Sequence, residues 1–573
     1  MKKFQRAVCV LTAAFLSLGA GACGGTPEEE GEVIRPATDT NDYRMDERIT
    51  VNTALVYNED WYAGTGFTPG DNPVYDLYES AVNVEMVNKF FLPFDGYSQQ
   101  ITAAHVTGDY PDIFYATDAM LDELIRNDAI VNLKPYYEQW GTAELKATLG
   151  YQGGINFDYC LRDGKLYGLP KVTDDCDRPT VWARTDWIAN LNARSASGKT
   201  LFDAENGRRF HAAGPGSLEE FWALAEAFAL EDPDGNGRKD TFGLAVSKGL
   251  DATTIPIFNA YDCYPTTLEK QADGSFVNRG LDPAMTKPLK KLYEAVRDGV
   301  IDSDYISWSN TDAWSKAASG QAGMVLGPAY LPTWPLSNTL SLGGDWCASP
   351  MYREGGGLVN PTRMPNVDGY FVVKKGFAHP EALVKLLNCL ATSDEENPWY
   401  VGYMAAAETV GTEKEIFNWM PVSIDRSTVN FERHAAFMKA IEAYEETGTF
   451  DESDIEARDF PTRWNMVKGY YLNATFTKGW AMYKTFYEGV TVAKRYGEGV
   501  FNDWNYPLSQ SNKNILARLE RTNDQVRNRI ISGKESDIDA AFATYIEDWY
   551  AGGGRTLLRD MKKYVESLGE THA

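Results

Sequence analysis

Strand-like and helix-like segments alternate along the chain, and this alternation limits it to an α/β architecture. Residues 49–57 are rich in β-branched and apolar side chains, and residues 82–87 alternate strictly between apolar and polar positions, so both are predicted strands. Residues 112–116 form a third short apolar run. Apolar residues recur at helical spacing in 121–130, 218–230, 287–296 and 380–390. Such alternation predicts parallel sheets packed against helices.

The clearest helix signal lies at residues 218–230. Ser217 and Glu220 have the spacing of a capping box, in which each side chain accepts a hydrogen bond from the other residue's backbone N–H. Phe221 and Phe228 belong to one apolar stripe. The last third of the chain is also predicted to be mostly helical, with aromatic stripes.

The charge balance excludes one large class of partner. The 573 residues include 55 Lys and Arg against 81 Asp and Glu, a formal net charge of −26. Nucleic-acid binding needs clustered basic side chains that displace counterions from phosphates, so we expect no nucleic-acid partner. Only five residues are His, which argues against a His-rich catalytic metal site. A chain of this length can form several domains or two large lobes.

The N-terminus has the features of an export signal. Lys2, Lys3 and Arg6 precede an uncharged apolar run at 7–22, which is too short to span a bilayer comfortably. Residues 1–22 are therefore predicted to be a signal peptide.

Small residues stand directly before Cys23, as in bacterial lipoprotein signals. In those signals the Cys is lipidated, with acyl chains such as palmitate, and becomes the first residue. Ala20 departs from that pattern, in which Leu is usual, and an ordinary signal peptide with a coincidental Cys is the alternative. Residues 23–48, with Gly, Pro, Thr and acids, are predicted to be a flexible tether. We expect the rest of the chain to lie outside the cell, held to the membrane by lipid.

The remaining cysteines are Cys160, Cys176, Cys263, Cys347 and Cys389. Their number is odd and no CxxC pair occurs, so buried free thiols are expected. A Cys160–Cys176 bridge is the alternative, because sequence does not fix connectivity.

An acidic loop follows the helix at 218–230. Counted from its first Asp, acid or amide oxygens fall at positions 1, 3, 5 and 9, a Gly stands at position 6, and position 7 can offer its carbonyl. This is the spacing of the first part of an EF-hand loop. The predicted ligands of a structural Ca²⁺ are Asp232, Asp234, Asn236, Arg238 and Asp240. Position 12 is Gly243 instead of Glu, and an Asx turn without metal is the alternative.

A set of short segments occurs in a characteristic order. The segments are 108–114 (GDYPDIF), 163–170 (DGKLYGLP), 181–187 (VWARTDW), 217–243, 319–324 (SGQAGM) and 369–382, followed by 530–533 and 548–554. In this order they resemble the extracellular solute-binding proteins of ABC transporters, family 1, which take up carbohydrates and oligosaccharides. The last two segments resemble the long, lipid-anchored members from Gram-positive bacteria.

The resemblance implies a two-lobed α/β fold of the periplasmic-binding-protein type (type II), with a central cleft, a hinge and a helical C-terminal extension. It places crossings between the lobes near 171–174, 324–328 and 372–375. Lobe one is then expected at 49–171 plus 326–372, and lobe two at 172–325 plus 373–573.

A sugar site needs aromatic surfaces for the apolar ring faces, with acid, amide and Arg side chains for the hydroxyls. In α/β sheets such a site lies beyond the carboxyl ends of the strands. The predicted ligand-binding residues are Asp60, Trp61, Tyr115, Asp118, Arg178, Trp182, Trp308, Tyr330, Trp334 and Asp368. Core packing is the alternative for each Trp, and a helix N-cap is the alternative for Asp118.

The predicted function is capture of an oligosaccharide by hinge closure and delivery to the permease subunits of an ABC importer. The protein is expected to be monomeric and not to be an enzyme. A glycoside hydrolase would need two carboxylates about 5–9.5 Å apart, and no motif singles out such a pair. A ligand-sensing surface protein and a peptide-binding protein on the same fold remain alternatives.

Overall fold

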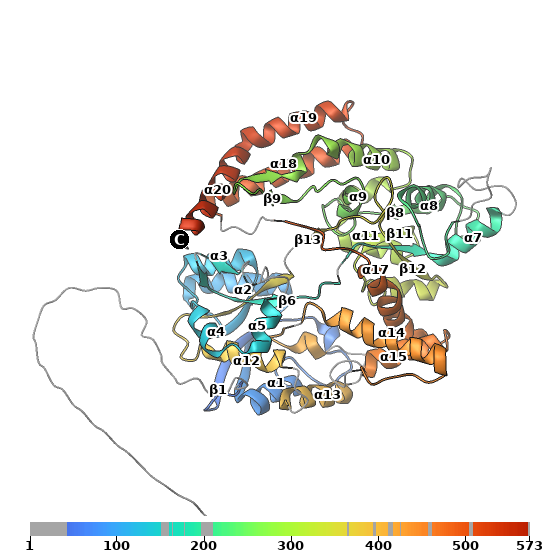
Figure 1. Ribbon diagram of the computed structural model, residues 1–573. Helices are drawn as coiled ribbons and strands as arrows, with labels where there is room; N and C mark the ends of the chain where they lie inside the picture. The colour runs from blue at the N-terminus through green and yellow to red at the C-terminus, as the bar shows by residue number, and fades with distance from the viewer. Residues whose placement is uncertain are drawn as a thin grey trace, which may run out of the picture. The chain divides into compact units, whose positions relative to one another are not determined.

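The protein is seen in a computed structural model (Figure 1). It describes residues 43–150, 157, 160–162, 164–176, 178–195, 210–363, 366–392, 397–410, 416–424, 426–455, 461–502 and 508–570. The predicted signal peptide, Cys23 and most of the predicted tether lie outside these ranges. None of the helices within them has the length and hydropathy that a membrane crossing requires.

Lobe one is built on five strands from distant parts of the sequence. They are β1 (Ile49–Val56), β2 (Val84–Leu92), β3 (Ile113–Ala116), β6 (Leu169–Val172) and β14 (Val367–Val373). β1 and β2 are parallel, whereas β14 lies antiparallel between β3 and β6. The N–H of Asp112 donates to the carbonyl of Asn52 at 2.6 Å, which places β3 beside β1. The strands predicted at 49–57, 82–87 and 112–116 correspond to β1, β2 and β3.

Helices cover this sheet and close the core of lobe one. They are α1 (Pro73–Leu77), α2 (Phe94–Thr107), α3 (Asp118–Arg126), α4 (Lys134–Trp140), α5 (Ala143–Leu149), α12 (Glu381–Ala391) and α13 (Pro398–Val410), with the hairpin β4 (Leu161–Arg162) and β5 (Lys165–Leu166). The buried apolar residues of this core run from Met45 to Val172 and again from Tyr370 to Ile424.

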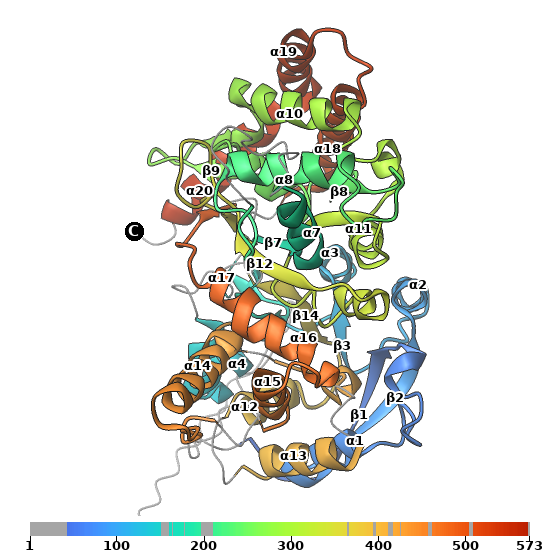
Figure 2. The same cartoon turned by 90° about the vertical axis from the view of Figure 1, so that its right-hand side faces the viewer.

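Lobe two has a four-stranded mixed sheet in the order β12, β7, β11, β8. These strands are β7 (Thr180–Arg184), β8 (Phe242–Ala245), β11 (Ala322–Gly327) and β12 (Trp346–Pro350). The helices of this lobe are α7 (Thr185–Ser195), α8 (Leu218–Leu230), α9 (Ile255–Asn259), α10 (Thr286–Arg297) and α11 (Asn310–Ala318). Two short strand pairs complete it, β9 (Leu268–Lys270) with β10 (Phe276–Asn278) and β13 (Thr362–Arg363) with β15 (Val500–Phe501). Figure 2 shows α8 lying along this sheet.

Local chemistry explains how α8 begins. The Ser217 hydroxyl accepts from the N–H of Glu220 at 3.1 Å, which is the first half of the predicted capping box. The Glu220 carboxylate instead accepts from the N–H groups of His211 and Gly216, both at 2.8 Å. The buried Glu220 thereby satisfies the loop before the helix as well as its first turn.

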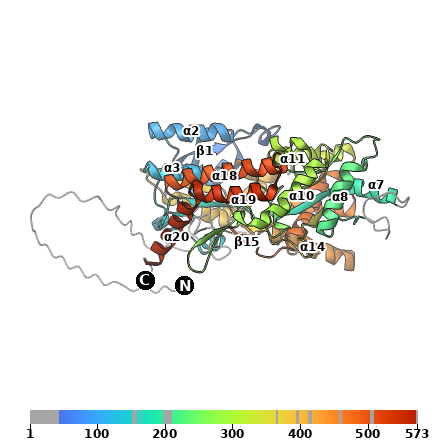
Figure 3. The same ribbon diagram turned by 90° about the horizontal axis from the view of Figure 1, so that it is seen from above.

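The C-terminal helices belong to the core of lobe two. They are α18 (Gln510–Ile531), α19 (Ile538–Trp549) and α20 (Arg555–Glu570), and they bury large apolar side chains such as Leu519, Ile530 and Trp549 in that core. α18 and α19 lie side by side, next to α10 (Figures 1 and 3). Near the start of α18, Lys513 forms an ion pair with Asp122 of lobe one.

A separate helical cluster spans residues 429–493 and has its own buried core, including Phe437, Trp464 and Phe486. Its elements are α14 (Val429–Thr447), α15 (Pro461–Leu472), α16 (Trp480–Tyr483), a π-helical segment (Lys484–Val490) and α17 (Thr491–Ala493). The helices predicted for the last third of the chain therefore belong to two separate packing units, this cluster and α18–α20.

The strand pairing and the cores correct three expectations: the parallel sheets, the extent of lobe one and the extent of lobe two. The sheets are mixed instead of parallel, because β14, β7 and β12 run antiparallel to neighbours. Residues 326–359 pack in lobe two, since β11 and β12 both pair with β7, and residues 373–424 pack in lobe one with β14 and α12. The predicted lobe boundaries differ from this division because the strands pair with partners that are distant in the sequence.

All five described cysteines are buried and free, which confirms the free-thiol expectation.

Three chain segments connect the lobes and the helical cluster, and Asp175 links them. Its carboxylate accepts from Arg178 at 2.9 Å and pairs with Arg363. Its backbone N–H donates to the carbonyl of Ser427 at 2.7 Å. Arg178 follows β6, Arg363 precedes β14 and Ser427 precedes α14, so the backbone and the carboxylate of one buried residue hold the crossings together.

Candidate functional site

A cavity of about 490 Å³ opens at the end of β1 and β3 in lobe one. We call it the aromatic pocket. Its principal lining residues are Trp61, Phe94, Tyr115, Lys171, Asp368 and Phe371. Trp61, Tyr115 and Asp368 were predicted from the sequence as ligand-binding residues, and the fold brings them together here.

The polar side of the aromatic pocket is centred on Tyr115. Its O–H donates to the carbonyl oxygen of Asp368, and Lys171 Nζ lies 2.9 Å from a carboxylate oxygen of Asp368 and 5.4 Å from the centre of the Tyr115 ring. Burial raises the pKa of Tyr115, and the charges of Asp368 and Asp118 raise it further. Tyr115 therefore remains a neutral phenol at physiological pH.

The loop after β1 is anchored by a distant segment. Trp419 donates from Nε1 to the carbonyl of Trp61 at 3.3 Å, and its ring stacks on Tyr62 at 4.7 Å between ring centres. This contact holds Trp61 at the pocket edge. The side chain of Asp60, the neighbouring candidate, lies outside the described part of the chain.

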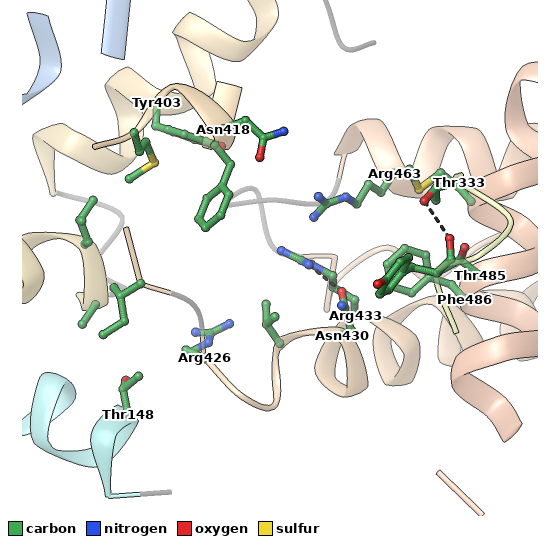
Figure 4. A pocket seen from close by; sticks show the side chains of 18 of the residues that line it. Thr148, Thr333, Tyr403, Asn418, Arg426, Asn430, Arg433, Arg463, Thr485 and Phe486 are labelled. Atoms are coloured by element: carbon green, nitrogen blue, oxygen red, sulfur yellow. Dashed lines mark hydrogen bonds between the residues drawn. The ribbon is translucent and has the colours of Figure 1, made fainter. Parts of the chain in front are cut away.

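A second cavity of about 460 Å³ adjoins the first, and the two share Phe417, Asn418 and Met420 as lining residues. We call it the arginine cavity, because Arg426, Arg433 and Arg463 line it. These three come from the helical cluster and the segment before it, whereas Trp399 and Tyr403 on the opposite wall come from lobe one. Figure 4 shows Arg433 and Arg463 pointing towards the middle of the cavity.

The loop after β11 borders the arginine cavity. Tyr330 and Thr333 are lining residues, and Tyr330 is 42% exposed. Trp334, which directly follows Thr333, is 50% exposed. Both predicted aromatic residues of this loop therefore present ring surface to solvent next to a cavity.

No protein-family model matches the sequence. Over 262 residues, 45% of the chain, it is 27% identical to the polygalacturonan/rhamnogalacturonan-binding protein YtcQ of Bacillus subtilis. Over 246 residues, 41% of the chain, it is 23% identical to lipoprotein LipO of the same organism. The matches span 47% and 43% of these two relatives, less than half of each.

Similar solved structures cover nearly the whole chain. The alginate-binding protein AlgQ2, determined without calcium ion, matches with a TM-score of 0.54 at 14% identity over 91% of this chain and 98% of its own. An HMO-binding, ABC-transporter-associated solute-binding protein from Bifidobacterium longum infantis matches at 0.56 and 13% over 91% and 98%. An EF-hand mutant of the S. pneumoniae ABC-transporter substrate-binding protein FusA, in complex with fructo-nystose, matches at 0.57 and 13% over 91% and 100%.

The chain has the fold of an ABC-transporter solute-binding protein. The resemblance indicated by the sequence motifs is thereby confirmed, as is the two-lobed α/β architecture with a helical C-terminal part.

Four predicted ligand-binding residues line neither the aromatic pocket nor the arginine cavity. Asp118 accepts from Tyr370 at 2.7 Å and from Arg162 at 3.0 Å, and it occupies the first turn of α3, which Thr117 caps. Arg178 holds the crossings through Asp175.

The other two are core residues. Trp182 has no exposed surface and donates from Nε1 to the carbonyl of Pro328 at 3.1 Å. It lies on β7, whose five residues are all buried between β12 and β11. Trp308 is 7% exposed and packs 5.7 Å from Phe242, between ring centres. Neither residue lines the aromatic pocket or the arginine cavity.

Sequence reasoning missed the arginine cavity. Arg426, Arg433 and Arg463 are widely spaced in sequence and lie in or next to helices, where arginine is common. No local motif distinguishes them from arginines on a solvated helix face. Only the packing of α14 and α15 beside lobe one shows that they face a cavity.

The predicted calcium loop folds into a tight acidic turn. The N–H of Gly237 donates to both carboxylate oxygens of Asp232, at 3.2 and 3.3 Å, and the Asn236 amide donates to Asp234 at 2.7 Å and to Asp240 at 3.1 Å. Burial raises the pKa of Asp234, and so do the neighbouring carboxylates. Within the described residues no group of three acid, His or Cys side chains is arranged to hold a metal ion.

Packing explains why position 12 of this loop lacks Glu. A Cβ on Gly243 would lie 1.9 Å from the carbonyl oxygen of Ala225, because β8 passes directly against α8. The helix–strand contact therefore requires Gly where an EF-hand places its bidentate ligand.

Proposed function

We propose that the protein captures a carbohydrate of oligosaccharide size in the cleft formed by the aromatic pocket and the arginine cavity, and delivers it to an ABC importer. The observation that carries this proposal is the cleft itself. Two adjoining cavities share one wall at Phe417, Asn418 and Met420, and lobe one and the helical cluster face each other across the second. Binding there can stabilise one arrangement of the lobes, as hinge-based capture requires.

The cleft has the chemistry that sugars need. Trp61 and Tyr115 offer ring faces for apolar C–H surfaces, and Lys171, Asp368 and Asn418 offer hydrogen-bond partners for hydroxyls. The relatives support a carbohydrate ligand: YtcQ is named for polygalacturonan and rhamnogalacturonan binding, and FusA is described with fructo-nystose. The relatives that are named for a function are binding proteins, and we infer a non-catalytic role for this chain as well.

The test is a thermal-shift screen of the chain from residue 24 against neutral and acidic oligosaccharides, followed by calorimetry and product analysis. A ligand at 100 times its Kd should add about 2.7 kcal/mol to the free energy of unfolding. Trp61→Ala should weaken every bound sugar, whereas Leu342→Ala, at an exposed site outside both cavities, should not. A shift without cleavage supports the proposal, whereas turnover of the sugar would replace it with an enzyme.

We further propose that Cys23 is lipidated and anchors the protein as a monomer to the extracellular face of the membrane. The small residues before Cys23 support this, and one relative is named a lipoprotein. In a host that processes lipoproteins, Cys23→Ser should move the protein from the membrane fraction to the medium. Retention of the variant in the membrane would contradict the anchor.

We also propose that the loop at 232–240 binds Ca²⁺ as a structural ion. Its donor set of three carboxylates, an amide oxygen and a carbonyl is of the kind that Ca²⁺ prefers. Burial raises the pKa of Asp234, and the nearby carboxylates of Asp232 and Asp240 raise it further, which supports a cation at this turn because a cation would relieve that repulsion. Binding would require the Asn236 amide to turn its oxygen inwards. EDTA should lower the melting temperature of the wild type but not of Asp240→Asn, and an unchanged melt with no metal in the purified protein would refute the site.

A further inference from the structure

We propose that the arginine cavity recognises carboxylate groups, so that the ligand is an acidic, uronate-containing oligosaccharide. This inference rests on the proposed carbohydrate-binding function and specifies its ligand class. It follows from the side chains that line the cavity, from their burial and from the wall opposite them.

The charge of the lining is opposite to that of the chain. Three of the described lining residues are arginines, and none of the lining residues in the described ranges is acidic. The whole chain has 81 acidic residues against 55 basic ones, so a local excess of Arg is not a reflection of composition. A cavity lined in this way attracts anions even though the molecule as a whole repels them.

Two of the arginines, Arg433 and Arg426, are held in place by side chains in or next to α14. Arg433 is 5% exposed and donates from Nη1 to the Asn430 side-chain oxygen at 2.7 Å. Arg426 pairs with Glu432 at 2.7 Å, and Thr428 donates to that Glu at 2.5 Å. Pre-positioned guanidinium groups lose little conformational freedom on binding, and their planar N–H pairs match the two oxygens of a carboxylate.

The opposite wall suits a sugar ring. Trp399, Tyr403 and Phe417 line the side contributed by lobe one, and Figure 4 shows Tyr403 and Asn418 facing the arginines across the cavity. A pyranose ring between these walls can place its apolar face on the aromatic groups and its carboxylate towards Arg433 and Arg463. Because the aromatic pocket adjoins this cavity, an oligosaccharide can extend from one into the other.

The experiment compares a galacturonate oligosaccharide with its methyl ester, which has the same sugar rings and linkages but no charge and one added methyl group on each uronate. Calorimetry is run with the wild type, Arg463→Gln, Arg433→Gln and the control Arg353→Gln, whose guanidinium bonds the carbonyl of Gly356 away from the cavity. Circular dichroism checks folding, and Arg463→Gln is informative even if the buried Arg433 proves necessary for folding.

We expect the wild type to bind the uronate at least tenfold more tightly than the methyl ester. Arg463→Gln should weaken uronate binding about ten- to hundredfold, since a hydrogen bond between charged groups is lost, and leave the methyl ester unchanged. Added salt should weaken only the uronate. Equal binding of both sugars, equal losses for both in the variant, or preference for a sulfated sugar or an acidic peptide would overturn the inference. Binding of neutral sugars alone would overturn it while keeping the proposed function, and binding of no sugar would overturn both.

Discussion

At the residue scale, a glycine sets the position of the aromatic surface in the cleft. Gly369 has φ +135°, and a Cβ there would lie 2.6 Å from the Tyr115 ring. Any larger residue would therefore strain the backbone and displace Tyr115, whose O–H donates to the neighbouring carbonyl of Asp368.

Gly369→Ala should lower both stability and ligand affinity. Backbone strain at such a position costs about 1–3 kcal/mol, and we expect about tenfold weaker sugar binding because the ring moves. Gly376→Ala is the matched control, since Gly376 also has positive φ but a Cβ there would meet no atom within 4 Å. Denaturation and calorimetry should show a stability loss in both variants and an affinity loss in Gly369→Ala alone. Unchanged affinity in Gly369→Ala would show that Tyr115 does not contact the ligand.

Residue type alone could not separate cleft aromatics from core aromatics. Trp61 and Trp182 were both predicted to contact ligand. Trp61 stands in the loop after β1 and lines the aromatic pocket, whereas Trp182 is central in β7, where both faces of the sheet are covered. The two residues differ in how many strands and helices surround them in the fold. A single sequence does not show which strands pair with each other, so it could not distinguish them.

At the element scale, α14 contains a buried histidine that must stay neutral. His434 Nε2 lies 2.8 Å from the Thr491 hydroxyl, which itself donates to the Tyr487 carbonyl at 2.6 Å. Nε2 therefore carries the proton, and Nδ1 can accept from Lys494 at 3.4 Å. Burial, together with the nearby charge of Lys494, lowers the pKa of His434 to about 4.

This arrangement predicts an acid-sensitive helical cluster. The folded pKa lies below the ordinary value of 6.5, so the unfolded chain takes up the proton first. Stability from this group is complete above pH 6.5 and is lost as pH falls towards 4, by at most about 3 kcal/mol. His434→Gln, which can still donate to Thr491, should flatten the melting temperature between pH 6.5 and 4 relative to the wild type. Parallel pH profiles for the two proteins would contradict the assignment.

Elements were more predictable than their partners. β1, β3 and α8 follow from local patterns, because β-branched runs and helical stripes act within one segment. β11 is a buried apolar strand of the same kind, but its place in lobe two depends on pairing with β7 and β8, distant in sequence. The arginine cavity could not be predicted for the same reason, because its walls come from segments that are distant in sequence and are brought together only by tertiary packing.

At the scale of the whole molecule, the C-terminal helices complete lobe two. α18 and α19 bury Leu519, Ile530 and Trp549 in the core that also contains α10. A chain ending at residue 507 would expose that core to water. Each large apolar side chain that loses its burial would lower the free energy of unfolding by about 1.5–3 kcal/mol. We expect such a truncation to abolish the cooperative melting of lobe two, seen by hydrogen exchange as loss of protection in β7 and β11. Full protection in the truncated chain would show that these helices are an accessory layer.

The crossings between lobes are a second whole-molecule feature, and Asp175 is central to them. Its carboxylate is 3% exposed and faces Arg178 and Arg363, which are themselves buried. Breaking a buried ion pair by removing one partner typically costs about 3–5 kcal/mol, because the remaining charges stay buried. Asp175→Asn should therefore destabilise the protein by about this amount in chemical denaturation. It should also weaken sugar binding, since the crossings fix how the helical cluster faces lobe one. Asp298→Asn, at an exposed pair with Arg297 at 2.7 Å, should change neither property. If Asp175→Asn were as stable as that control, the backbone hydrogen bonds at 173 and 175 would be sufficient to hold the crossings.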